Sequence, residues 1–146
     1  MRKMSPMDAY KHFEHLINTR QIGHGFLHRN MSIKMMNGRL NAEHKRKVST
    51  FTISEDEIIE QMLFAAEDYA EIIANWINNS QESSLPIYFV CEKPIGITVD
   101  AEHPEGRAAD LLVIGLVRVQ DYENLRDSFK ITTEYCDVNK HENIKN

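Results

Sequence analysis

The spacing of apolar residues predicts a long amphipathic helix in the middle of the chain. From Ile58 to Ile77, apolar residues recur at steps of three and four, which is the period of one helical face. The segment S-E-D-E at 54–57 precedes them and has the pattern of a capping box, with acidic residues that suit the helix dipole. We therefore expect a helix that begins after Ser54, ends at Asn78-Asn79 and buries one face in the core.

Two weaker helical patterns precede this segment. Ser5-Pro6 has the residue types of an N-cap and a first helical position, and the apolar spacing that follows predicts a helix over about 5–20. Residues 26–40 have only irregular helical periodicity, which stops near Asn37-Gly38. We interpret them as one short, irregular helix.

The pattern changes after Ser83 to short runs of branched and aromatic residues, which are typical of strands. Four such runs occur, at 85–92, 95–99, 111–119 and 128–136. The polar stretch between the second and third runs is interpreted as a loop. Because no helix separates the runs, the strands are expected to be antiparallel.

These elements predict an α+β fold in which N-terminal helices pack on a twisted antiparallel sheet formed by the C-terminal half. The length of 146 residues suits a single domain, 1–146. Within it we expect a helical part over about 5–80, a sheet over 85–138 and a frayed tail at 139–146. No apolar run is long enough to span a bilayer, so no membrane anchor is expected.

The charge is divided unevenly along the chain. Residues 1–50 contain ten Lys and Arg against three Asp and Glu, a balance of +7, whereas the rest has seven against nineteen, a balance of −12. Five of the seven histidines also lie in the first 50 residues. This asymmetry favours a polyanionic partner for the basic part, with mutual attraction of the two parts as the alternative.

Metal and cysteine chemistry find little support in the sequence. The pairs His12/His15 and His24/His28 have helical ligand spacing, but glycines flank His24 and no third ligand motif follows. Solvent-facing histidines are the favoured interpretation. The two cysteines lack a motif context and are too few for a disulfide framework, so they are interpreted as buried or idle thiols.

The last predicted strand contains the segment ITTEY at 131–135. Alternation places Thr133 and Tyr135 on one face, preceded on that face by Phe129 and Ile131. Such a face would change from apolar to polar near the end of the strand, as the edge of a cleft requires. The alternative is a half-buried strand whose hydroxyls bond to neighbouring groups.

Several short motifs, taken in order, resemble the ribonuclease A-like toxin domains of bacterial contact-dependent growth-inhibition proteins and related polymorphic toxins. The matching residues lie within 23–138 and are His28, Arg39-Leu40, Ser49-Thr50-Phe51, the long helix, Ile95-Gly96 and Thr133-Glu134-Tyr135. The chain departs from the family at Gly23, where the family has a histidine, although His24 lies one step away. It also departs at 102–109, which has the appearance of a local insertion.

The resemblance implies a metal-independent ribonuclease without a cofactor, in which the ribose 2′-hydroxyl attacks the adjacent phosphorus and leaves a 2′,3′-cyclic phosphate. His28 then carries a proton, Arg39 clamps the phosphate, and Thr133 and Tyr135 donate hydrogen bonds or a proton. Histidine titrates near neutral pH, and arginine stays charged and can hold two phosphate oxygens. Tyr135 and His24 remain alternative proton donors.

The basic run Lys45, Arg46 and Lys47 is a candidate for contacts with the RNA backbone, and a solvated loop is its alternative. Ser49-Thr50-Phe51 is expected to set the entry to the long helix. The resemblance also implies an RNA substrate, with tRNA as a candidate, and a cognate immunity protein. It further implies a monomer outside that complex and delivery into the cytoplasm of a target cell as part of a larger toxin.

Two other classes of function compete with this hypothesis. A non-catalytic binding protein, such as an acidic immunity partner, fits the negative balance after residue 50 but does not require the ordered motifs. An ADP-ribosyltransferase needs a catalytic glutamate in a Q-x-E or E-x-E pattern near a late strand, and the sequence has neither there.

Overall fold

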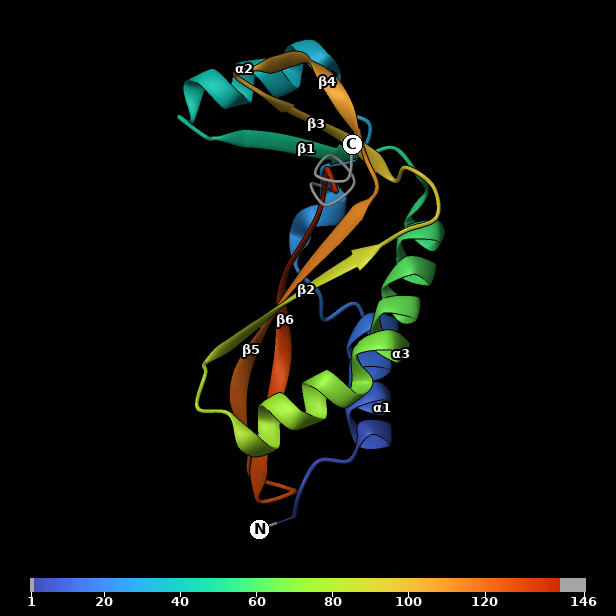
Figure 1. Ribbon diagram of the computed structural model, residues 1–146, viewed down its shortest axis with the longest axis vertical. Helices are drawn as coiled ribbons and strands as arrows, with labels where there is room; N and C mark the ends of the chain where they lie inside the picture. Colours follow the sequence, from blue (N-terminus) through green and yellow to red (C-terminus); the bar gives the residue numbers. More distant parts are fainter. Residues whose placement is uncertain (1, 140–146) are drawn as a thin grey trace.

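The computed structural model describes residues 2–139 and has α+β architecture, as the sequence predicts (Figure 1). The elements in chain order are α1 (Pro6–Asn18), the 3₁₀ helix η1 (His24–Leu27), α2 (Ile33–Ala42), β1 (Lys47–Phe51), α3 (Glu55–Asn79), β2 (Ser84–Val90), β3 (Gly96–Asp100), β4 (His103–Ala109), β5 (Leu111–Asp121) and β6 (Arg126–Asp137). Within this described part of the chain, no helix is long and apolar enough to cross a membrane. Apart from Asn139, the predicted frayed tail lies outside the described residues.

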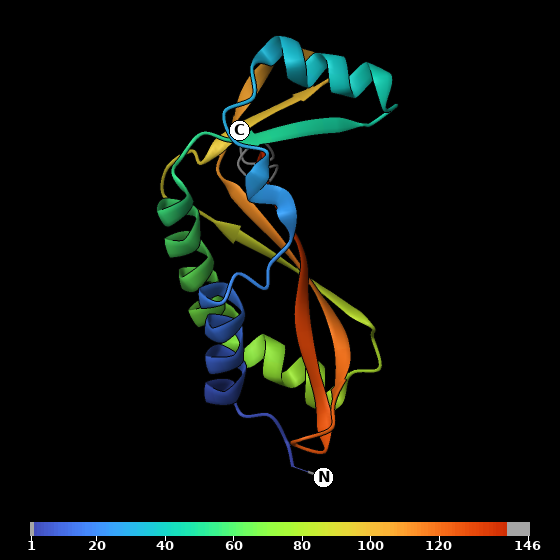
Figure 2. The same ribbon diagram turned by 180° about the vertical axis from the view of Figure 1, so that it is seen from behind.

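The larger part of the molecule, here called the large lobe, consists of α1, α3 and the antiparallel sheet β2-β5-β6. The two helices pack on each other and cover one face of this sheet (Figures 1 and 2). Their apolar faces meet the sheet in a core that includes Phe13, Met62, Ile73, Ile114 and Phe129. Burial of such side chains contributes roughly 1.5–3 kcal/mol each, which makes this core the main source of stability.

The predicted caps of both helices are present. Ser54 Oγ accepts a hydrogen bond from the Glu57 amide at 3.2 Å, and Glu57 Oε1 accepts one from the Ser54 amide at 3.1 Å. Ser5 and Asp8 form the equivalent box before α1. The sequence interpretation of α1 and α3 is therefore confirmed. α3, however, lies in the middle of the chain, between β1 of one sheet and β2 of the other.

The small lobe consists of α2 and the antiparallel sheet β1-β3-β4, and it lies at the end of the molecule opposite the N-terminus (Figure 1). It has its own core, formed by Met36, Leu40, Val48 and Val99. β1 and β3 also contact β6, so the small lobe rests on the end of the large sheet. The boundary between the two lobes is formed by β1, η1 and the last residues of β6.

The expectation of one sheet from four strands is wrong, because residues 2–139 contain six strands that form two separate sheets. β1 lies inside the region predicted to be helical, and β4 occupies the stretch predicted to be a loop. β4 has the sequence HPEGRAA, which has low strand propensity, and it forms by pairing with β3 along one edge. Tertiary pairing thus overrides local propensity at this strand.

The predicted irregular helix over 26–40 is also corrected. The segment contains η1 and, after a break, the regular helix α2, which ends at Ala42 rather than near Gly38. Ser32 provides the N-cap, because its Oγ accepts a hydrogen bond from the Met35 amide at 3.1 Å. Gly38 faces open space, so the helix continues through it at a cost of about 1 kcal/mol relative to alanine.

A β-bulge near the end of β6 changes the predicted alternation. Gly115 of β5 pairs with Thr133, whereas Leu116 pairs with Ile131, so Thr132 is an extra residue on β6. Ile131, Glu134 and Cys136 are all buried, while Thr133 is exposed. Thr133 therefore does not continue the face of Ile131, and the predicted apolar-to-polar change along a single face is wrong. The bulge turns Thr133 and Tyr135 to the other face.

Candidate functional site

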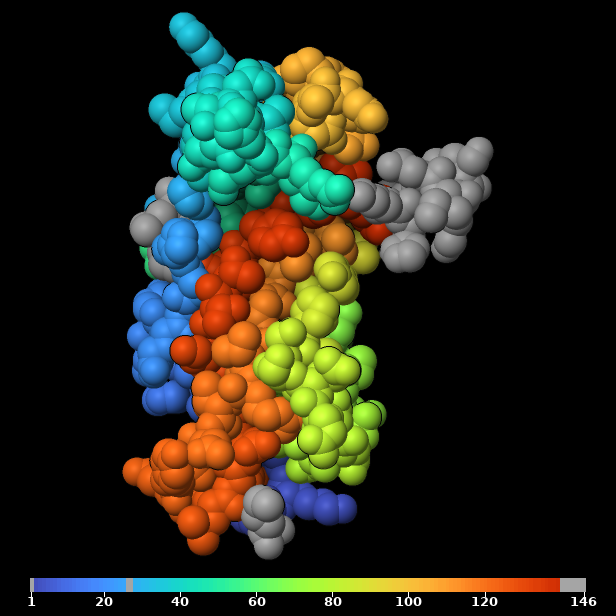
Figure 3. Space-filling view, turned by 90° about the vertical axis from the view of Figure 1, so that its left-hand side faces the viewer, coloured from blue at the N-terminus to red at the C-terminus, as the bar shows by residue number. Residues whose placement is uncertain are grey.

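A recess of about 300 Å³ lies at the boundary between the two lobes. Figure 3 shows it below the teal β1–α2 region and above the red strand β6. Its walls come from η1, α2 and β1, which follow one another in the first third of the chain, and from β6, which is distant from them in sequence. The lining residues are His24, Gly25, His28, Arg39, Lys45, Lys47, Val48, Ser49, Phe51, Thr133, Glu134, Tyr135 and Cys136. All four residues that the sequence predicts as catalytic, His28, Arg39, Thr133 and Tyr135, are among them.

His28 is held in place by backbone bonds to β1. Its carbonyl accepts hydrogen bonds from the Phe51 amide at 3.0 Å and from the Thr50 hydroxyl at 2.9 Å, and its amide donates to the Gly25 carbonyl at 3.0 Å. These bonds fix the main chain from which the imidazole projects. The Ser-Thr-Phe segment is therefore strand β1 and supports His28, rather than only leading into α3.

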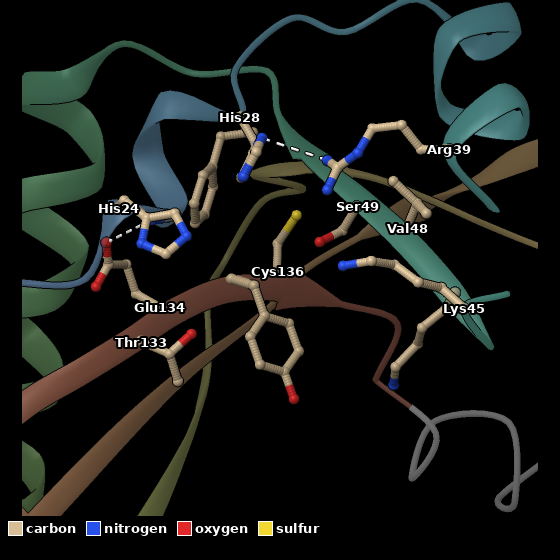
Figure 4. A pocket seen from close by; sticks show the side chains of 13 residues that line it. His24, His28, Arg39, Lys45, Val48, Ser49, Thr133, Glu134 and Cys136 are labelled. Carbon is tan, nitrogen blue, oxygen red and sulfur yellow. Dashed lines mark hydrogen bonds between the residues drawn. The ribbon is translucent and has the colours of Figure 1, made fainter. Parts of the chain in front are cut away.

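Arg39 on α2 contacts His28 directly. Its Nη1 donates to His28 Nδ1 at 3.3 Å (Figure 4). Its Nε donates to Glu43 Oε2 at 2.9 Å. Because a guanidinium has only donors, Nδ1 accepts this bond, and the proton of the neutral ring lies on Nε2. The ion pair with Glu43 orients the guanidinium and leaves its Nη2 edge available for an anion.

The surroundings of His28 favour its neutral form. Burial of the ring lowers its pKa below the ordinary 6.5, and the positive charges of Arg39, His24 and Lys45 lower it further. Glu43 acts in the opposite direction but is the smallest of these influences. An imidazole with a lowered pKa is mainly neutral at pH 7 and is therefore suited to accept a proton there.

β6 supplies the opposite wall of the recess. Thr133 is exposed, and Tyr135 is half-buried. Burial raises the pKa of the Tyr135 phenol above 10, although the nearby Lys47 charge opposes this rise. Both hydroxyls are therefore protonated at neutral pH and available as hydrogen-bond donors.

His24 is a site residue to which the sequence reasoning gave only a secondary role. Its ring centroid lies 6.0 Å from that of His28, and Figure 4 shows His28 between His24 and Arg39. Gly23 cannot carry the family's histidine here, because a Cβ at this position would lie 2.7 Å from the Thr133 Cα. The shift of one position therefore places an imidazole in the recess that a side chain at position 23 could not provide.

The basic run is divided between two hollows. Lys45 and Lys47 line the recess, whereas Arg46 lines the neighbouring hollow together with Asp100 and Arg107. Lys47 Nζ is also ion-paired with Asp137. Lys45 and Lys47 thus add positive charge to the recess that contains Arg39, whereas Arg46 lies outside its lining.

The described residues contain no group of three or more His, Cys, Asp or Glu side chains that could hold a metal ion. His12 instead contacts the Phe129 carbonyl through Nε2 at 2.8 Å, which is a structural role. Both cysteines are free and buried, and burial raises the pKa of Cys91 to about 11 and that of Cys136 to about 12. Neither is a nucleophilic thiolate at neutral pH.

Comparisons with known proteins identify a structural neighbour. No family model matches the chain, and no curated protein matches its sequence. Among solved structures, the chain resembles a chain of the CdiA-CT/CdiI complex from Y. kristensenii 33638, with a TM-score of 0.65 and 20% sequence identity. The alignment covers 84% of this chain and 98% of that chain. At this level of identity, the similarity shows a shared fold.

Proposed function

We propose that the protein is a metal-independent ribonuclease that cleaves RNA by transphosphorylation. The observation that carries the proposal is the recess in which Arg39 contacts His28 opposite Thr133 and Tyr135. RNA supplies its own nucleophile, so the protein has to accept one proton, donate another and stabilise charge on the phosphate. An imidazole, a guanidinium and two neutral hydroxyls meet these three needs.

In the proposed reaction, the 2′-oxygen forms a bond to phosphorus and the bond from phosphorus to the 5′-oxygen breaks. His28 takes the proton of the 2′-hydroxyl, and a second group gives a proton to the leaving 5′-oxygen. In the protein without substrate, the Nδ1 lone pair of His28 accepts a hydrogen bond from Arg39. When Arg39 turns to hold two phosphate oxygens, this lone pair becomes available, so substrate binding itself exposes the base.

The second proton carrier is either His24 or Tyr135, and the pH profile of cleavage distinguishes them. The lowered pKa of His28 means that the activity rises with pH through a midpoint below 6.5. The raised pKa of Tyr135 means that a tyrosine acid keeps the activity high beyond pH 10. The alkaline limb of the kcat/KM profile therefore assigns the acid: we expect it to be lost in His24→Ala and to persist in Tyr135→Phe.

The basic residues of the recess predict a dependence on salt. Each phosphate contact contributes a slope of about −0.7 in a plot of log affinity against log salt for single strands. Replacing Lys45, Arg46 and Lys47 together by alanine is expected to weaken RNA binding at low salt. It should also make this slope less steep by the equivalent of one to three phosphate contacts. Binding to an uncleavable RNA, followed over a salt series, measures the change. An unchanged slope would remove these lysines and this arginine from the substrate path.

A role in a toxin system is the biological setting that we propose. Its support is the fold shared with a chain of a CdiA-CT/CdiI complex, together with the toxin-like order of His28, Arg39, Thr133 and Tyr135 in the sequence. The chain would be delivered as part of a larger toxin and act on cytoplasmic RNA, with tRNA as a candidate substrate. An immunity protein with acidic groups over the recess would block it.

The competing hypothesis is that the chain is an acidic, non-catalytic partner of the same kind of system. The structural neighbour comes from a two-component complex, and the balance of −12 after residue 50 fits such a partner. The positive recess favours the ribonuclease. Incubation with total tRNA in the presence of chelator separates the two hypotheses, because only a metal-independent nuclease produces cyclic-phosphate ends under these conditions.

A further inference from the structure

Glu134 is a buried carboxylate between the two predicted substrate-facing residues of β6. Its relative exposure is 0%, although it lies at the edge of the recess. Burying a carboxylate is costly unless hydrogen bonds compensate for the lost water. A buried acid in the middle of the Thr133–Tyr135 motif therefore requires a structural reason.

That reason lies in the turn that carries the histidines. Glu134 Oε1 accepts a hydrogen bond from the Gly25 amide at 3.0 Å, across 109 positions of sequence (Figure 4). Gly25 directly follows His24, and its carbonyl accepts the hydrogen bond of the His28 amide. One carboxylate oxygen on β6 thus binds the backbone of the short segment from which both imidazoles project.

The fit between this turn and β6 is too close for side chains. A Cβ at Gly25 would lie 1.7 Å from the Glu134 carbonyl oxygen, and one at Gly23 would lie 2.9 Å from Glu134 Oε2. Real Cβ atoms do not approach other atoms so closely. The two glycines let η1 lie directly on β6, and the hydrogen bond to Glu134 fixes its position there.

We propose that Glu134 is a positioning residue for the ribonuclease reaction: it holds the His24–His28 turn against β6 so that both imidazoles face the phosphate bound by Arg39. The inference rests on the proposed function. It adds Glu134, which acts on the position of the two imidazoles through the Gly25 amide. The bulge at Thr132 is what brings the Glu134 side chain to this buried side.

Two substitutions of Glu134 test the proposal. Glu134→Gln keeps an oxygen that accepts the Gly25 amide and should retain most of the cleavage rate. Glu134→Ala removes the acceptor and should lower kcat by about 10- to 100-fold, because a misplacement of about 1 Å is enough for such a loss. KM should change little, since Arg39 and the lysines are on other elements. Equal rates for the wild type and Glu134→Ala, or equal losses for both variants, would overturn the proposal.

Hydrogen exchange of the Gly25 amide tests the same contact without relying on the cleavage rate. The Gly25 amide should exchange slowly with solvent in the wild type and in Glu134→Gln, and faster in Glu134→Ala. Gly25→Ala introduces a Cβ that would clash with the Glu134 carbonyl oxygen and push the turn away from β6. It should therefore reproduce the kcat loss of Glu134→Ala. If circular dichroism shows that Glu134→Ala is unfolded, Glu134→Gln and Gly25→Ala decide whether Glu134 has the positioning role. A loss of kcat in Gly25→Ala together with a retained rate in Glu134→Gln supports this role. Any other pair of results opposes it.

The outcomes separate this inference from the proposed function. If the wild type does not cleave RNA, the proposed function fails, and the proposed catalytic positioning role of Glu134 fails with it, whatever the Gly25 exchange shows. If the wild type cleaves RNA, His28→Ala abolishes cleavage and Glu134→Ala has no effect, only the positioning role fails.

Discussion

Replacing His28 by alanine is expected to reduce RNA cleavage by about 10²- to 10⁴-fold, the usual contribution of a general acid or base. No other side chain in the described part of the recess combines contact with Arg39 and a pKa lowered below 6.5. Because the His28 backbone is held through its carbonyl by β1 and through its amide by the Gly25 carbonyl, we expect the substitution to leave the fold intact. Initial rates on a defined RNA measure the effect.

His15→Ala is the matched control for this substitution. His15 is an exposed histidine on α1, outside the lining of the recess, so its loss removes the same side chain without touching the site. Its rate should equal that of the wild type, and the thermal unfolding of both variants should remain close to that of the wild type. Cleavage retained by His28→Ala would remove this residue from the mechanism.

Replacing Arg39 by alanine should lower the rate by about 10²- to 10³-fold, the typical loss of one positioned electrostatic donor. A second effect follows from the pKa of His28. Arg39 helps to lower this pKa, so its removal raises the pKa and moves the acidic limb of the pH profile to higher pH. A loss of rate together with this upward shift is specific to a cation beside the base.

Two further variants sharpen the test of Arg39. Arg39→Lys keeps a charge but not the planar pair of donors, so it should recover only part of the rate while keeping the acidic limb near its original position. Lys34→Ala removes an exposed charge from the same helix, outside the recess, and should leave both quantities unchanged. An acidic limb that stays in place in Arg39→Ala would contradict the assigned contact with His28.

The elements with strong local signals were predictable from the sequence. The capping box at Ser54 and the apolar repeat through α3 specify that helix without help from the rest of the chain. β4 could not be predicted in this way, because its polar residues form a strand only by pairing with β3. The division into two sheets also depends on long-range contacts, which local patterns do not contain.

The candidate site shows the same limit at the level of single residues. Simple alternation grouped Thr133 with Ile131, because a bulge at Thr132 has no distinct sequence signal. The spacing of eleven residues between His28 and Arg39 predicted no contact by itself, and the resemblance to a toxin family supplied the pairing. The role of Glu134 depends on a close approach to Gly25, and only coordinates can show that approach.

The central claim is that His28, Arg39, Thr133 and Tyr135 surround a single scissile phosphate. The most direct measurement is the incubation of wild-type protein and His28→Ala with total tRNA in excess chelator, followed by analysis of the new RNA ends. We expect 2′,3′-cyclic phosphates and free 5′-hydroxyls with the wild type, and formation of these ends at a rate lower by about 10²- to 10⁴-fold with His28→Ala. Intact RNA with the wild type, or cleavage that requires a divalent cation and leaves 5′-phosphates, would contradict it.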